Sequence, residues 1–296
     1  MSATSLFTTR RGEFRRIYGQ LRRDRALFAR TPIVFCEGDS WFATPLAMNL
    51  LDWLVWPAPE DETRGVPLFG AGGLFFRAEH SGDRALQMFD ADGVRDKVDW
   101  FAAFEFDLVL LSAGGNDFVG DFLVELFADV RRAMSVDAAL QRVRASGRYA
   151  AVRAALQRMI AALQATRAGV PVLAHSYDYP RRLGAPAVLS LHNVGLAALA
   201  RSGLGPWIAP ALAVALPAAA DQREFARGLI DGYVAEVLEP LRADPVSGQV
   251  FDFVDLRGTL TREDQWADEM HPTSAGFALL AARFRRQARA RLQIEV

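Results

Sequence analysis

The chain contains 296 residues, of which 51% are hydrophobic and 23% charged, and its 34 basic residues nearly balance its 35 acidic residues. This composition is typical of a soluble protein with a large core, and the formal net charge of -1 argues against nucleic acid as a partner. Cys36 is the sole cysteine, which excludes an internal disulfide and a cysteine-rich zinc cluster.

Residues 1–30 are predicted to form an amphipathic helical extension. Apolar side chains recur there at helical spacing, with arginines between them, and these apolar residues are Phe14, Ile17, Tyr18 and Leu21. The stretch lacks the apolar run and the small-residue cleavage site of a signal peptide. We therefore expect a cytoplasmic protein with this helix docked on the main domain and its arginines in water.

A buried strand is predicted from Ile33 to Cys36, and it ends at the sequence Gly38-Asp39-Ser40. Ligands of open α/β sheets bind in the crevice outside the carboxyl ends of the strands. A serine at such a strand end is a candidate nucleophile. The alternative is a simple turn in which Ser40 caps the next helix.

Helical patterns alternate with short apolar runs along the rest of the chain. Helices are expected at about residues 45–56, 83–89, 96–104, 149–168, 221–241 and 273–292, and strands at 66–69, 108–111, 170–174 and 250–254. The glycine cluster at 70–73 lacks the third glycine of a dinucleotide-binding motif, so it predicts a turn. The alternation predicts one α/β domain over residues 31–296, with a parallel central sheet covered on both faces.

Residues 181–220 interrupt this alternation with a stretch rich in Leu, Ala, Gly and Pro. The prolines argue against a membrane-spanning helix, although the apolar run from 203 to 220 has about the required length. We expect an apolar helical cap near the site, with Trp207 near its middle. A second core layer of packed helices is the alternative.

Polar residues follow the ends of three predicted strands. Asp39 and Ser40 follow the first strand, Asn116 follows the strand at 108–111, and Asp268 and His271 lie in the loop after the last strand. A serine hydroxyl needs an adjacent base, and a histidine base needs a carboxylate that fixes its tautomer. A spacing of three residues lets one turn bring the carboxylate of Asp268 to one ring nitrogen, with the other facing Ser40. Backbone N–H groups and the Asn116 amide are candidate donors to an oxyanion.

Three other polar residues at or near predicted strand ends are expected to have structural roles. Asp39 is predicted to hold the Ser40 loop by hydrogen bonds, and Asp117 to cap the segment after Asn116. His175 is predicted to be packed and hydrogen-bonded rather than catalytic. His271 is then the histidine best placed to act as a base, because it lies in a polar loop before a proline and a helix.

Four blocks in this order resemble the SGNH (GDSL-type) hydrolase superfamily. They are Gly38-Asp39-Ser40, Ser81-Gly82-Asp83, Gly114-Gly115-Asn116-Asp117 and Asp268-x-x-His271-Pro272. Together they frame the chain from about residue 32 to 290. The first block continues with Trp41 where leucine is frequent, which is typical of a divergent branch.

This resemblance implies a flavodoxin-like α/β/α fold and the hydrolysis of esters. It implies Ser40 as nucleophile and His271 as base supported by Asp268. The N–H groups of Ser40 and Gly82 and the side chain of Asn116 would form the oxyanion hole. The second block is the least specific of the four, so Gly72 or Gly73 is an alternative to Gly82.

The substrate is predicted to be a small-molecule ester that is lipid-like rather than a sugar acetate, because the 181–220 segment is apolar. We assign Trp41, Tyr177 and Trp207 to substrate binding, with aromatic packing as the alternative for Tyr177. No cofactor, metal, nucleic acid or integral membrane segment is expected, and a homo-oligomer is left open.

Four alternatives are weighed against an acyl esterase of this kind. A carbohydrate acetylesterase would have the same residues, because the fold does not select the substrate. A metallophosphoesterase needs several His and Asp ligands, and this chain has only four histidines. A binding module without activity is expected to have lost a member of the triad. An α/β-hydrolase is disfavoured, because Phe42 replaces the second glycine of the G-x-S-x-G motif.

Overall fold

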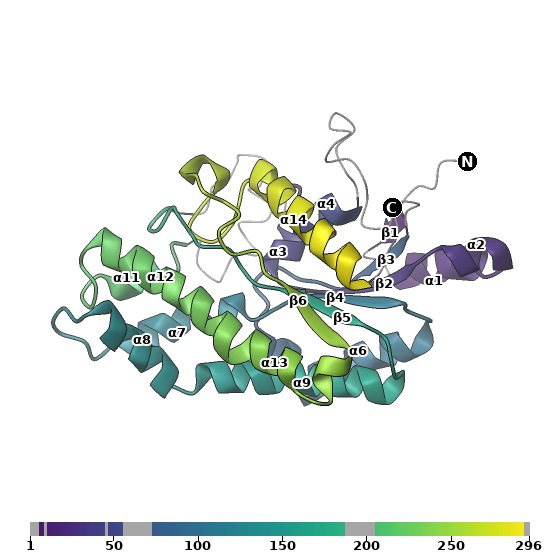
Figure 1. Ribbon diagram of the computed structural model, residues 1–296, viewed down its shortest axis with the longest axis horizontal. Helices are drawn as coiled ribbons and strands as arrows, with labels where there is room; N and C mark the ends of the chain where they lie inside the picture. Colours follow the sequence, from purple (N-terminus) through teal and green to yellow (C-terminus); the bar gives the residue numbers. More distant parts are fainter. Residues whose placement is uncertain (1–5, 9–10, 45–46, 56–72, 187–204, 293–296) are drawn as a thin grey trace.

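The computed structural model describes residues 6–8, 11–44, 47–55, 73–186 and 205–292 (Figure 1). In this described part, six parallel strands form one sheet in the order β1-β3-β2-β4-β5-β6. The strands are β1 (Leu6–Thr8), β2 (Ile33–Gly38), β3 (Leu74–Arg77), β4 (Leu108–Ser112), β5 (Val172–His175) and β6 (Phe251–Val254). Without β1, the order is that of the flavodoxin-like doubly wound sheet.

The central strands are almost continuously apolar because helices cover both faces of the sheet. Every residue of β2 and of β4 is buried. Figure 1 shows one layer of helices above the sheet and one below it. The upper layer contains α3 (Ser40–Ala43), α4 (Leu50–Val55) and α14 (Ser274–Leu292), and the lower layer contains α6 (Ala91–Ala103), α9 (Arg148–Thr166) and α13 (Glu239–Ala243). The predicted three-layer α/β/α fold is confirmed.

Further helices lie along the chain after β3. They are α5 (Ala85–Met88), η1 (Gly115–Phe118), α7 (Asp121–Phe127), α8 (Val136–Ala145), α11 (Ala209–Leu212), α12 (Ala219–Tyr233), η3 (Val234–Leu238), η4 (Ser247–Gln249) and η5 (Glu263–Gln265). The strand predicted at 66–69 lies outside the described residues. Strand β3 was not expected, because four residues directly after a glycine cluster carry too short an apolar run to separate a strand from the turn.

The N-terminal stretch adds a strand to the predicted helices. Helices α1 (Arg11–Leu21) and α2 (Arg25–Arg30) are present, and Phe14 and Tyr18 of α1 are buried against Phe104. Strand β1 pairs in parallel with β3 and forms the edge of the sheet, so this stretch is not helical throughout. No described helix is both long and apolar enough to cross a bilayer.

The described part of the 181–220 segment packs partly as core. Leu212, Ala215 and Leu216 are fully buried, and the Ala215 carbonyl accepts a hydrogen bond from the Met134 amide at 2.9 Å. Residues 187–204 in the middle of the predicted cap lie outside the described residues. In residues 205–220, α11 and the residues after it therefore pack in part as a core layer, which was the alternative to a cap.

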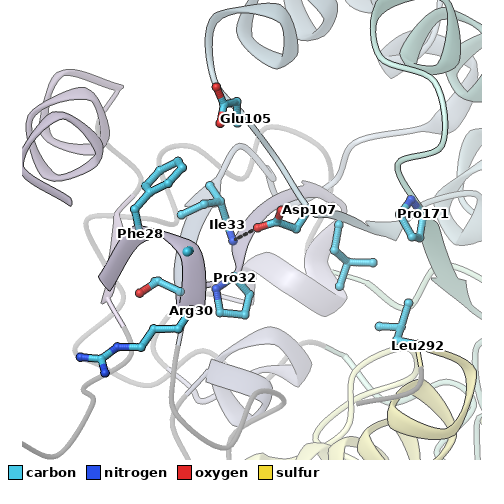
Figure 2. A pocket seen from close by; sticks show the side chains of 11 residues that line it. Phe28, Arg30, Pro32, Ile33, Glu105, Asp107, Pro171 and Leu292 are labelled. Carbon is cyan, nitrogen blue, oxygen red and sulfur yellow. Dashed lines mark hydrogen bonds between the residues drawn. The ribbon is translucent and has the colours of Figure 1, made fainter. Parts of the chain in front are cut away.

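A hollow of about 470 Å³ lies at the amino ends of β2, β4 and β5. Figure 2 shows its walls, which include Phe28, Pro32, Pro171 and Leu292, and the hydrogen bond from the Ile33 amide to Asp107. Because the strands are parallel, this hollow is at the opposite edge of the sheet from Ser40. It is therefore separate from the candidate site described next.

Candidate active site

Ser40 is the first residue of α3, directly after β2, and Asp39 is the N-cap of that helix. One carboxylate oxygen of Asp39 accepts hydrogen bonds from the Trp41 amide at 3.0 Å and from the Ser112 hydroxyl at 2.7 Å. Its other oxygen accepts a hydrogen bond from the Tyr177 hydroxyl. Burial raises the pKa of Asp39 above its ordinary value, while these hydrogen bonds oppose that rise. Asp39 thus fixes the turn that presents Ser40.

Gly38 allows β2 to approach β4 closely at this turn. A Cβ atom on Gly38 would lie 2.6 Å from the Ser112 carbonyl oxygen and 2.7 Å from the Ser112 Cβ. Both contacts are shorter than real Cβ atoms tolerate, and the first is to backbone, which cannot move aside. The glycine of the first block is therefore required by packing between the two strands.

His271 connects Ser40 to Asp268. Its Nε2 lies 2.8 Å from the Ser40 hydroxyl oxygen, and its Nδ1 lies 3.0 Å from both carboxylate oxygens of Asp268. Asp268 also accepts hydrogen bonds from the Met270 and His271 amides, at 2.8 and 2.7 Å. Burial disfavours the charged carboxylate, but these hydrogen bonds outweigh it and hold the pKa of Asp268 below its ordinary value. Asp268 therefore carries a negative charge beside the imidazole at neutral pH.

Asn116 lies on η1, just past the carboxyl end of β4. Its side-chain amide donates a hydrogen bond to the Asp83 carbonyl oxygen at 2.9 Å. This contact brings the second block beside the third, because Gly82 directly precedes Asp83 and follows the carboxyl end of β3. Gly82 is exposed, with a φ of +87° that favours glycine. Gly73 instead precedes β3 at the opposite edge of the sheet, and Gly72 lies outside the described residues.

Asp117 has a different structural role from the one predicted. It does not cap the segment after Asn116, because its carboxylate accepts hydrogen bonds from the Ala85 and Leu86 amides, at 2.7 and 3.2 Å. These amides belong to the start of α5, which is 31–32 residues away in the chain. Burial raises the pKa of Asp117 to about 6. This contact joins the helix that follows the second block to the third block.

The two glycines before Asn116 make room for two tyrosine rings. A Cβ atom on Gly114 would lie 2.7 Å from the Tyr233 ring, and one on Gly115 would lie 2.7 Å from the Tyr177 ring. Gly114 also has a φ of +105°, which side chains rarely adopt. The Tyr233 hydroxyl donates to the Ala113 carbonyl oxygen at 2.6 Å. Packing against both rings therefore fixes the turn that presents Asn116.

Trp41, Tyr177 and His175 form an aromatic layer beneath Ser40. The Trp41 and His175 rings stack at a centroid distance of 5.6 Å, and Tyr177 contacts both rings edge-on. The Trp41 indole N–H donates to the Met270 carbonyl oxygen at 3.2 Å. Trp41 and Tyr177 are only 3% and 6% exposed. Both side chains are buried in this layer, as in the packing alternative for Tyr177, and substrate binding by Trp41 and Tyr177 stays a prediction.

Trp207 has a different environment, at the candidate site itself. Its ring contacts the His271 ring edge-on at a centroid distance of 5.6 Å, and its side chain is half-buried. Its carbonyl oxygen accepts a hydrogen bond from the Gly120 amide at 2.9 Å, in the loop after Asn116. Of the three predicted substrate-binding residues, Trp207 is the one with a partly exposed ring beside His271.

His175 is buried as a neutral imidazole, as predicted for a packed histidine. Its Nδ1 lies 2.9 Å from the Ser176 carbonyl oxygen, and its Nε2 has no hydrogen-bond partner among the described residues. Burial lowers its pKa from 6.5 to about 4. Because the unfolded chain protonates near pH 6.5 and the folded protein near pH 4, the unfolded state binds more protons between these values.

We therefore expect His175 to reduce stability as the pH falls from about 6.5 to about 4, on the order of 3 kcal/mol in total. Urea unfolding of the wild type and of His175→Gln at several pH values in this range measures the effect. The difference between the two free energies of unfolding cancels the other titrating groups that both proteins share. A difference that does not change with pH would contradict the neutral burial of His175.

No group of three or more His, Cys, Asp or Glu side chains that could hold a metal ion is present in the described ranges. The polar side chains at the carboxyl edge of β2 and β4 include Ser40, His271, Asp268 and Asn116. The strand order of the sheet changes direction between β2 and β4. In doubly wound sheets, ligands bind at the carboxyl ends of the strands at this point.

No protein-family model and no curated protein sequence matches this chain. Among solved structures, a lipase from a goat rumen metagenome superposes with a TM-score of 0.50 at 12% identity, over 86% of this chain and 97% of that one. A putative GDSL-like lipase from Bacteroides ovatus superposes with a TM-score of 0.48 at 12% identity, over 90% of this chain and 55% of that one. An acetyl esterase mutant with acetate superposes with a TM-score of 0.44 at 14% identity, over 89% of this chain and 99% of that one.

The chain has a doubly wound α/β/α fold similar to that of the goat rumen lipase. The four sequence blocks that carry the predicted resemblance follow β2, β3, β4 and β6, all at the carboxyl edge of the sheet. The structure brings Ser40, Asp268 and His271 into one hydrogen-bonded chain and holds Gly82 beside Asn116. Sequence reasoning did not assign a role to two residues of this site. Tyr233 packs against the turn that carries Asn116, and Glu269, in the His271 loop, accepts hydrogen bonds from distant backbone amides.

Proposed function

We propose that this protein is a serine hydrolase that cleaves carboxylic esters through an acyl-enzyme intermediate. The observation that carries the proposal is the hydrogen-bonded chain from the Ser40 hydroxyl through both ring nitrogens of His271 to Asp268, with distances of 2.8 and 3.0 Å. Such a chain is the arrangement that activates a serine nucleophile. On this proposal, residues 31–296 form the hydrolase domain, and the N-terminal stretch is an extension docked on it.

In the first half of the reaction, the Ser40 oxygen attacks the ester carbonyl carbon while His271 Nε2 accepts the hydroxyl proton. The imidazolium that forms is stabilised by the charged carboxylate of Asp268. When the tetrahedral intermediate collapses, the bond to the alcohol oxygen breaks, and His271 returns its proton to that oxygen. The alcohol leaves, and the acyl group remains on Ser40.

In the second half, a water molecule takes the place of the alcohol. His271 removes a proton from the water as it attacks the acyl carbon, and Ser40 then leaves with that proton. The carboxylic acid is released, and the free serine is restored. The same imidazole therefore serves as the base in both halves of the reaction.

The oxyanion of each tetrahedral intermediate is proposed to lie between three donors. Ser40 is the first residue of α3, so its N–H has no acceptor within the helix. The Gly82 N–H lies on the adjoining loop, and Asn116 has a second amide hydrogen besides the one donated to Asp83. Donors fixed in this way act mainly on the transition state.

We expect Asn116→Ala to lower kcat by about 10²–10³, the usual effect of removing one oxyanion donor. Steady-state kinetics on a p-nitrophenyl ester measures this change. The free energy of unfolding of the variant should be measured in parallel, because the hydrogen bond to Asp83 is lost as well. If only KM rises and kcat is retained, Asn116 contacts the ground state rather than the oxyanion.

The substrate is proposed to be an ester with an apolar acyl chain, and Trp207 to contact that chain. This rests on the half-buried Trp207 ring against His271 and on the apolar composition of the segment that carries it. A carbohydrate acetylesterase is the second candidate, since an acetyl group needs no apolar wall. A hydrophobic pocket gains on the order of tenfold or more for a well-packed methylene group.

A panel of p-nitrophenyl esters from acetate to octanoate tests both the activity and the acyl preference. We expect kcat/KM to rise with chain length in the wild type and to rise less in Trp207→Ala. Activity on acetate alone would favour the carbohydrate acetylesterase. A protein without esterase activity that instead binds stoichiometric metal and hydrolyses a phosphate ester would support a metallophosphoesterase, and one that binds ligands without turnover would support a binding module.

A further inference from the structure

Glu269 stands between the catalytic residues proposed above, and the mechanism does not use it. Its side chain is fully buried, directly after Asp268 in the chain. One of its oxygens accepts hydrogen bonds from the Gly184 and Ala209 amides, both at 2.9 Å. The other accepts hydrogen bonds from the Ile208 amide at 2.6 Å and from the Trp207 amide. A buried carboxylate is costly unless it is fully paired, and four N–H donors pair this one.

These four donors come from two separate parts of the apolar segment. Gly184 lies just before residues 187–204, and the other three donors lie just after them. Arg182 strengthens the first attachment, since its guanidinium donates to the Trp266 and Ala267 carbonyl oxygens at 3.2 and 2.9 Å. Glu269 therefore joins both flanks of the segment to the loop that carries Asp268 and His271.

The attachment also determines where Trp207 lies. The amide of Trp207 is bound to Glu269, its carbonyl oxygen to the Gly120 amide, and its ring lies against His271. Trp207 thus bridges the His271 loop and the loop after Asn116. Without Glu269, the three amides of residues 207–209 would lose their common acceptor, and the ring would lose one of its two backbone attachments.

We propose that Glu269 is a positioning residue, which fixes Trp207 against His271 and thereby sets the acyl-chain preference of the enzyme. A carboxylate suits this task because its two oxygens offer four acceptor sites. Glutamine has nearly the same shape but replaces one oxygen with an NH₂ group, which would face N–H donors. Glu269→Gln therefore removes the acceptor with little change in volume. The preference rests on the proposed ester hydrolysis, whereas the placement of Trp207 does not.

The placement is tested without catalysis, through the proton NMR signals of the His271 imidazole. The chain has four histidines, and a His271→Ala variant identifies the signals of His271. We expect Trp207→Ala to shift these signals, because an indole ring 5.6 Å away contributes a ring-current shift. Glu269→Gln should shift them in the same direction, while the signals of exposed His80 stay in place. Glu263→Gln, which changes an exposed glutamate nearby, is the matched control and should shift neither.

The acyl preference is tested by a double-mutant cycle on two esters, p-nitrophenyl octanoate and p-nitrophenyl acetate. We expect Glu269→Gln to lower the ratio of their kcat/KM values about tenfold, mainly through KM for the octanoate. A loss of folded protein would lower both values equally and leave the ratio unchanged. Combining Glu269→Gln with Trp207→Ala should lower the ratio no further than Trp207→Ala alone, because both changes remove the same contact.

The outcomes separate this proposal from the proposed function. Unshifted His271 signals in Glu269→Gln, or an additive cycle, would overturn the positioning role even if the esters are cleaved. If the wild type cleaves no ester in the panel, the proposed function fails, and the NMR comparison still decides whether Glu269 places Trp207. If Glu269→Gln does not fold, the same measurements are made on Glu269→Asp. Its side chain is shorter by one methylene group, so its carboxylate oxygens lie farther from the four amides. Wild-type signals together with a wild-type ratio in Glu269→Asp would also overturn the proposal.

Discussion

Ser40→Ala is expected to lower kcat for ester hydrolysis by roughly 10⁴–10⁶ while the protein stays folded. Without the hydroxyl oxygen no acyl-enzyme can form, and the reaction is left to direct attack by water. The fold should persist, because Ser40 is a small residue at the start of a four-residue helix, and Asp39 rather than Ser40 supplies the capping hydrogen bond. Turnover of a p-nitrophenyl ester, together with circular dichroism, measures both parts of the expectation.

Ser135→Ala is a matched control for this variant. Ser135 is an exposed serine that caps α8, away from the candidate site, so its replacement should cost about 1 kcal/mol of stability with no loss of turnover. Wild-type turnover by Ser40→Ala would show that another group is the nucleophile. An equal loss in both variants would point to an indirect effect on folding.

The second large effect is expected for His271. His271→Ala should lower kcat about as much as Ser40→Ala, because the members of a catalytic triad act as a unit. Asp268→Asn should lower kcat by up to about 10⁴, since an amide no longer stabilises the imidazolium and favours the other tautomer. The same ester assay measures both variants.

His175→Ala is the informative comparison, because His175 is the other histidine near Ser40. It is buried beneath Trp41, and its Nε2 has no hydrogen-bond partner in the part of the chain that the structure describes. Its replacement should lower stability through the cavity that it leaves, while the remaining folded protein keeps its activity. An enzyme silenced by His175→Ala but spared by His271→Ala would reverse the assignment of the base.

The sequence allowed the chemical groups of the site to be predicted because they lie in short local patterns. Asp268 and His271 are three residues apart, so one turn is enough to pair them, and the structure has this hydrogen bond. Ser40 and Asn116 each follow a strongly apolar strand. Parallel strands align their carboxyl ends at one edge, so topology alone brings these residues together.

The supporting contacts could not be predicted, because they join residues far apart in the chain. Asp117 binds amides 31–32 residues away, and Glu269 binds amides about 60–85 residues away. No spacing rule connects a buried carboxylate to the backbone of a distant loop. The burial of Trp41 could not be predicted either, since an aromatic residue after a nucleophile fits a pocket wall and a packed layer equally well.

The accuracy with which a strand could be predicted depended on the length of its apolar run. The five residues of β4 form an uninterrupted buried run, and this strand was predicted within one residue. Strand β1 has three residues in a stretch otherwise typical of an amphipathic helix, and it exists through pairing with β3. Such an edge strand is determined by its partner more than by its own sequence.

The most direct test of an activated serine is covalent labelling with a fluorophosphonate probe, followed by intact-mass and peptide analysis. The account predicts one adduct per wild-type chain, located on Ser40, no adduct on Ser40→Ala, and much slower labelling of His271→Ala. An unlabelled wild-type protein, or an adduct on a residue other than Ser40, would contradict the assignment of Ser40 as the nucleophile.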